Sequence, residues 1–125
     1  MRFRAAETAY ALPVEHVTEV RSAADLTSLP TPRVGVAGLV ARADGALTVL
    51  SVLGASGSHV IVVEEGPLTF GLLVDEVTDV VRVDDARIGP PPKGQAGVTV
   101  AGVIHDDDEL VLLLDAVALR ATLSA

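Results

Sequence analysis

Near the start of the chain, apolar residues alternate with other residues at Tyr10, Leu12 and Val14. They then recur at every third position, at Val17 and Val20. A period of two is typical of a strand with one buried face, whereas a spacing of three indicates a helical turn. The pattern therefore predicts a strand that passes into one helical turn and returns to extended chain.

The same pattern occurs again sixty residues later. YALPVEHVTEV begins at Tyr10, and FGLLVDEVTDV begins at Phe70. A second echo, offset by sixty-four residues, relates VAGLVARADGALTVL from Val36 to VAGVIHDDDELVLLL from Val100. The duplication predicts one structural unit built twice, with halves at roughly residues 8–54 and 68–118.

Each copy of the second echo contains two apolar runs around a polar tip, which predicts a β-hairpin. Another hairpin is expected around a turn from Glu64 to Pro67. Proline clusters at residues 29–33 and 89–97 indicate surface loops, and a short helix is expected after Leu114. Many short strands predict a mainly β fold of two small five-stranded barrels packed into one unit, with short helical turns. The lack of long amphipathic segments argues against a doubly wound parallel sheet.

Glu15 and Asp75 occupy equivalent places in the two copies, directly after a predicted strand. A carboxylate there can accept from the free N–H groups of a starting helical turn. A catalytic pair would have to converge on one substrate, whereas duplication places one residue in each half. A structural role is favoured for both.

The chain has 125 residues, half of them apolar, which fits a single domain over residues 1–125. Its net charge of −8 and lack of basic runs argue against nucleic acid as a partner. Cysteine is absent, which removes disulfides and thiolate chemistry and fits a reducing compartment. No apolar run is long enough for a signal peptide or a membrane helix. We therefore expect a cytoplasmic protein without direct membrane insertion.

The residues from His105 to Glu109, HDDDE, are the best metal candidate and define the alternative of a metal-dependent enzyme. Consecutive residues rarely converge on one centre, because calcium loops space their ligands. A solvated hairpin tip is the favoured interpretation. His16 and His59 have no metal-ligand spacing, and the glycine-rich stretches match neither a nucleophile elbow nor a phosphate loop. We expect no metal, no cofactor and no catalytic residue.

Five segments also carry a family resemblance: YALPVEHVTEV, LPTPRVGVAGLV, HVIVVEEGPLTFGLLVDEVTDVVRV, IGPPP and VAGVIHDDDELVLLLDAVAL. In order and spacing they resemble the CheW-like domains of bacterial chemotaxis adaptors, from about Phe3 to the end of the chain. The resemblance implies two SH3-like barrels and no catalysis. It also implies two partners, the regulatory domain of a CheA-type histidine kinase and the cytoplasmic tip of a chemoreceptor.

The resemblance also implies partner-binding residues, which are Val17, Glu19, Gly38, Leu39 and Arg42. Val17 and Glu19 match family positions implicated in partner contact, and the other three flank a stretch that departs from the family. The family typically has an Asn-Leu-Arg-Gly stretch there, but this chain places its arginine one residue early. The departure keeps open a divergent scaffold for another signalling partner. Val17 fits core packing equally well, because buried and interface valines look alike in sequence.

Overall fold

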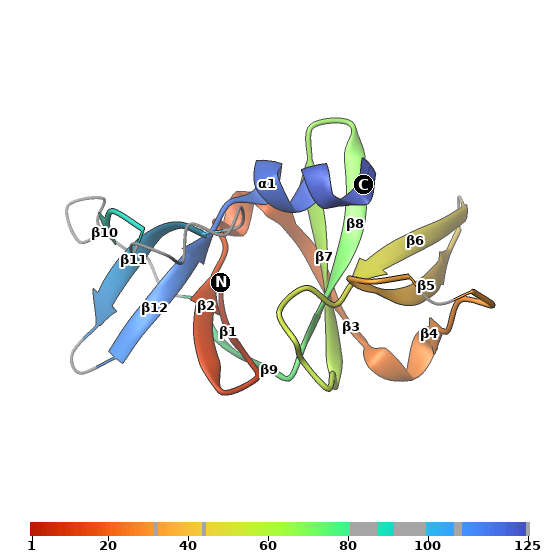
Figure 1. The fold of residues 1–125 in the computed structure, drawn as a ribbon, viewed down its shortest axis with the longest axis horizontal. Helices are drawn as coiled ribbons and strands as arrows, with labels where there is room; N and C mark the ends of the chain where they lie inside the picture. The colour runs from red at the N-terminus through yellow and green to blue at the C-terminus, as the bar shows by residue number, and fades with distance from the viewer. Residues whose placement is uncertain (32, 44, 81–87, 92–99, 107–108, 125) are drawn as a thin grey trace.

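A computed structural model describes residues 1–31, 33–43, 45–80, 88–91, 100–106 and 109–124 (Figure 1). Within these ranges the strands are β1 Arg2–Ala5, β2 Thr8–Ala11, β3 Val17–Ser22, β4 Leu26–Thr27, β5 Val36–Arg42, β6 Gly45–Leu50, β7 His59–Glu65, β8 Leu68–Val74, β9 Glu76–Asp79, β10 Ile88–Gly89, β11 Val100–Asp106 and β12 Glu109–Leu114. The helical segments are η1 Val14–His16, η2 Ala23–Asp25, α1 Ala116–Ala121 and η4 Thr122–Ser124.

The described strands form two six-stranded sheets with the same internal order. Sheet A runs β10-β11-β12-β2-β1-β9, and sheet B runs β4-β5-β6-β8-β7-β3. In each sheet one strand, β10 or β4, has only two residues. The expected mainly β fold with two packed β units is confirmed, and the three predicted hairpins and the closing helix are present. The expected five strands in each unit are exceeded, because each described sheet gains a sixth strand from the two-residue β4 or β10.

The first hairpin of each copy of the repeat pairs with the later strands of the other copy. The hairpin β1–β2 at the start of the chain lies in sheet A, with strands β9 to β12 of the second copy. The hairpin β7–β8 lies in sheet B, with strands β3 to β6 of the first copy. The chain therefore crosses between the sheets after β2 and again after β8, and each sheet contains strands of both copies.

Sheet B must curl strongly. Its edge strands β3 and β4 lie at opposite ends of the sheet, yet only the three residues of η2 separate them. Four Cα steps from Ser22 to Leu26 span at most about 15 Å. The edges of a flat six-stranded sheet would lie about 24 Å apart. The short connection therefore bends the sheet toward a barrel.

A central core lies between the two sheets and draws on both copies. Its buried members among the described residues are Phe3, Leu12, Leu50, Ile61, Val63, Phe70, Leu72, Val74, Leu114, Ala116 and Leu119. Helix α1 crosses from the end of β12 toward the β7–β8 hairpin and covers this core on one side (Figure 1). Arg120 in α1 pairs with Glu65 at 2.9 Å, which fixes the helix to β7.

Glu15 and Asp75 differ in the structure despite their equivalent places in the repeat. Glu15 lies exposed inside η1 and caps nothing, because the turn begins at Pro13 without a side-chain cap. Asp75 starts no helical turn. Its carboxylate accepts the amides of Gly57 and Ala6, each at 2.8 Å. The structural role holds for Asp75, but its donors come from two distant segments and not from a helix.

The pKa of the Asp75 carboxyl lies below its ordinary value of 3.8. The main cause is the hydrogen bond from the Gly57 amide, followed by the bond from the Ala6 amide, because both favour the charged form.

We predict that Leu12→Ala and Leu72→Ala each lower the free energy of unfolding by about 2 to 5 kcal/mol. Both leucines are almost fully buried in the central core, at equivalent places in the two copies. Urea denaturation measures the effect. A surface-like value for either variant would contradict the shared core.

We also predict an acid-sensitive contribution from Asp75. Its lowered pKa means that the ionised carboxylate stabilises the fold above about pH 3.8, and that this contribution is lost as the pH falls through the lower folded-state value. Asp75→Asn should therefore be less stable than wild type at about pH 7, and it should lose less stability on acidification. Urea melts at neutral and acidic pH measure both changes. Glu15→Gln is the matched control and should follow wild type throughout.

Candidate partner-binding groove

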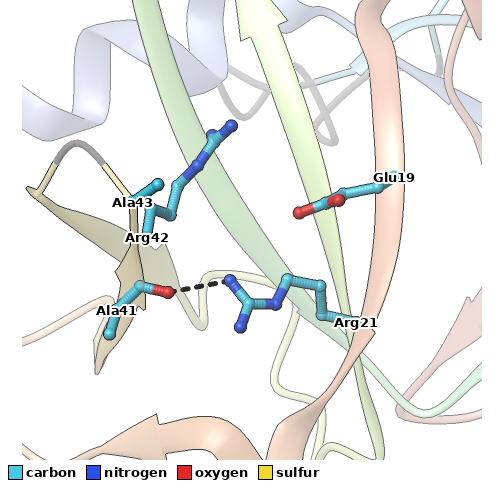
Figure 2. Close-up of a pocket in the computed structure, with 5 residues that line it drawn as sticks. All are labelled: Glu19, Arg21, Ala41, Arg42 and Ala43. Carbon is cyan, nitrogen blue, oxygen red and sulfur yellow. Dashed lines mark hydrogen bonds between the residues drawn. The ribbon is translucent and has the colours of Figure 1, made fainter.

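An open groove lies on sheet B between the edge strand β3 and the tip of the β5–β6 hairpin (Figure 2). It has a volume of about 610 Å³, and it is lined by Glu19, Arg21, Ala41, Arg42 and Ala43. Two cations and one carboxylate thus face solvent in a chain whose overall charge is −8.

The walls of the groove follow from the strand arrangement. Strand β3 pairs only with β7, so its other side faces the open seam of the curled sheet. Thr18, Glu19 and Val20 are all exposed there. On the opposite wall, Arg42 ends β5 and pairs with Gly45 of β6, and its side chain lines the groove.

Arg21 holds the two walls together. Its Nη1 donates to the carbonyl of Ala41 at 2.9 Å (Figure 2). Its Nη2 lies 3.3 Å from the Asp25 carboxylate. Glu19 and Arg42 point into the groove from opposite walls (Figure 2). Across the described part of the chain, neither side chain has a hydrogen bond or an ion pair. These two charges are available to a partner.

In sheet A, a side chain of the sheet itself spans the equivalent seam. Asp79 and Asp106 stand there at the repeat positions of Glu19 and Arg42. Arg2 pairs with both aspartates. Across the described residues, the seam therefore occurs in both sheets. In sheet A, Arg2 pairs with the acids on both sides of the seam. In sheet B, Arg21 spans the seam to the Ala41 carbonyl and leaves Glu19 and Arg42 without ion pairs in the described part of the chain.

Strand register gives one reason for the difference between the two seams. Arg2 lies opposite Ala11 in sheet A, and its repeat mate Val62 lies opposite Gly71 in sheet B. Val62 is fully buried in the core of sheet B, so this position supplies no cation to the seam. The seam residues differ as well, because Glu19 and Arg42 stand where sheet A has two aspartates.

The acidic tip of the β11–β12 hairpin, at residues 105–109, differs from the solvated tip that the sequence led us to expect. The hairpin is present, but its acids are not simply solvated: Asp106 pairs with Arg2, and Glu109 pairs with Arg4 at 2.8 Å. The described residues contain no group of three or more potential metal ligands. Asp107 and Asp108 lie outside the described residues. Two of the carboxylates proposed as ligands therefore neutralise arginines of β1.

The structure brings together two of the five residues implied by the resemblance, Glu19 and Arg42. Val17 is half-buried against the central core, as is its repeat mate Val77. Leu39 is half-buried in β5. Arg21 was missed, because nothing in the sequence shows that a basic residue on β3 reaches across to Ala41.

Gly38 is a packing residue. A Cβ atom at this position would lie 2.2 Å from the carbonyl oxygen of Thr27, so β4 could not approach β5. Its repeat mate Gly102 has the same role, because a Cβ there would lie 2.7 Å from the Gly89 carbonyl oxygen. The fold itself requires glycine at both places.

The described residues thus form two packed β sheets, and sheet B carries an open, charged seam. Comparison with known proteins gives the family. The CheW-like domain matches residues 1–123. The structure is similar to the crystal structure of scaffolding protein TtCheW from Thermoanaerobacter tengcongensis, with a TM-score of 0.81, 26% sequence identity, and coverage of 91% of this chain and 86% of that one. Among curated proteins, no sequence matches this chain.

The chain belongs to the CheW-like domain family, the scaffolding proteins of chemotaxis signalling. The family is non-catalytic, so the metal-dependent enzyme alternative is wrong. Among the helices that the structure describes, none is long and apolar enough to cross a membrane.

We predict that Gly38→Ala and Gly102→Ala each destabilise the fold by about 1 to 3 kcal/mol or more, because the added methyl group meets backbone that cannot rotate away. Gly89→Ala is the control, since its Cβ would meet only the Val103 carbonyl oxygen at an ordinary 3.8 Å. Thermal denaturation of the three variants measures the difference. Equal melting temperatures for Gly38→Ala and the control would contradict the packing role.

Proposed function

We propose that this protein is a cytoplasmic adaptor that couples a chemoreceptor to a CheA-type histidine kinase. Its partners are the regulatory domain of the kinase and the cytoplasmic tip of the receptor. Membership of the CheW-like family and the fold shared with a scaffolding protein support the class. The groove on sheet B supports the place of docking.

The choice of the sheet B groove as the docking surface rests on one observation. In sheet A, Arg2 pairs with the acids on both sides of the seam. In sheet B, Arg21 spans the seam, but Glu19 and Arg42 have no hydrogen bond or ion pair within the described ranges. Exposed charges cost little while water solvates them. A partner that excludes this water must supply complementary groups, because a buried charge without a partner is strongly unfavourable. The groove therefore selects partners by charge as well as by shape.

The other residues implied by the resemblance act around this groove. Val17 packs against the central core at the start of β3, and Gly38 lets β4 approach β5. Neither residue lines the groove, so both act through packing beside it. The apolar part of the groove comes from Ala41 and Ala43, which line it beside the charged residues. Docking thus combines charged side chains with a small apolar area, a composition common in protein interfaces.

We predict that Glu19→Ala and Arg42→Ala each weaken binding to the kinase regulatory domain at least about tenfold, because each removes a charge-assisted contact. Calorimetry with CheA-type regulatory domains and a receptor-tip fragment of the same organism measures the affinities. Arg42→Lys keeps the charge and tests whether the guanidinium geometry matters. Glu15→Ala is the control, because Glu15 is exposed outside the groove.

These measurements test the docking surface and the coupling function separately. Wild-type binding that neither groove variant weakens would overturn the groove as the docking site. No binding of folded wild type to any of these kinase domains or receptor tips would overturn the coupling function and favour a scaffold for another signalling partner.

A further inference from the structure

The loop at residues 51–58, between β6 and β7, contacts two separate parts of the fold. The Ser58 amide donates to the Val74 carbonyl at the end of β8, at 3.1 Å. The Ser58 carbonyl accepts from the Ala23 amide at the start of η2, also at 3.1 Å. The preceding amide, of Gly57, donates to Asp75. The loop is therefore fixed between the second crossing and η2.

Asp75 stands at the crossing from sheet B to sheet A, and it binds both sides. Its own amide donates to the Arg4 carbonyl of β1 at 2.9 Å. Its carboxylate accepts from Ala6 in the β1–β2 turn through one oxygen and from Gly57 through the other. One side chain thus joins the hairpin of sheet A to the loop that precedes β7 of sheet B.

The β1–β2 turn depends on this support. Ala5 pairs with Thr8, so the turn has only two residues, and both have left-handed backbones, with φ of 49° at Ala6 and 69° at Glu7. Asparagine and glycine are the usual residues in such turns, because other side chains are strained there. The bond from the Ala6 amide to Asp75 helps to keep this turn in place.

The hydrogen bonds continue from the loop to the groove. Ala23 begins η2, which is capped by the Ser22 hydroxyl at the Ala24 amide. Asp25 ends η2 and holds Arg21, whose guanidinium also binds the Ala41 carbonyl. An unbroken set of contacts therefore leads from the turn of sheet A to the groove wall of sheet B.

We propose that Asp75 is a positioning residue that couples the β1–β2 turn of sheet A to the groove wall of sheet B. It contacts no residue of the groove and acts through the loop and η2. A carboxylate suits this place because its two oxygens accept from two amides at once. An asparagine would present a donor to one of those amides. The coupling is a property of the chain itself and does not depend on which partner binds.

Amide hydrogen exchange in Asp75→Asn tests this coupling. We expect exchange at Ala6, Gly57 and Ala23 to become about tenfold faster or more, relative to the core amide of Ile61, which reports global opening. The Arg21 side-chain resonance should move toward that of an unbound guanidinium. In the matched control Glu15→Gln, all these signals should stay as in wild type. Faster exchange at Ala6 and Gly57 alone, with Ala23 and Arg21 unchanged, would overturn the coupling and leave Asp75 as a local cap.

A second variant keeps the test decisive if Asp75→Asn does not fold. Ala6→Gly relaxes the strained turn and leaves the Asp75 carboxylate intact. We expect it to shift the Gly57 and Ala23 amide resonances and the Arg21 side-chain resonance of the folded protein. Shifts confined to the β1–β2 turn would overturn the proposal.

Discussion

The central core shared by the two copies is the constraint on which the rest of the structure depends. Its buried side chains, such as Phe3 from sheet A and Phe70 from sheet B, lie between sheets that have exchanged their first hairpins. Neither sheet is complete without strands of both copies. Burial of this apolar surface is the main stabilising term, and it requires the chain to cross twice between the sheets. Those crossings set which strands share a sheet, and helix α1 covers the core between the sheets (Figure 1).

The two copies of the repeat share the same backbone packing but differ in the side chains at their open seams. Gly38 and Gly102 occupy equivalent places and allow the same close approach of neighbouring strands, so this part of the repeat preserves packing. At the open seams the side chains differ. Arg2 neutralises the acids of sheet A, whereas Glu19 in sheet B has no such partner among the described residues. The sheet A seam is thus neutralised by an internal ion-pair network, whereas the sheet B seam keeps two charges in solvent, which is the basis of the proposed docking site.

Both crossings between the sheets carry an acid, but only Asp75 supports the structure. Its carboxylate binds amides from segments that are far apart in the sequence, and it reaches the groove through the loop before β7 and through η2. At the first crossing, the His16 ring binds the Glu64 carbonyl at 3.0 Å and Glu15 stays in solvent. An adaptor gains from such a rigid junction, because partners held on a fixed surface lose less binding energy to ordering.

The sequence by itself determined the strands, the hairpins, the repeat and the burial of Leu12 and Leu72, because alternation and duplication are local patterns that register in a β-sheet must obey. It also contained the family signature and the candidate pair Glu19 and Arg42. Tertiary structure alone decided that the copies exchange hairpins and that Arg21 spans the seam. It also decided that Asp106 pairs with Arg2. These outcomes depend on which distant strands become neighbours, and hydrophobic periodicity specifies which face of a strand is buried but not which strand lies beside it.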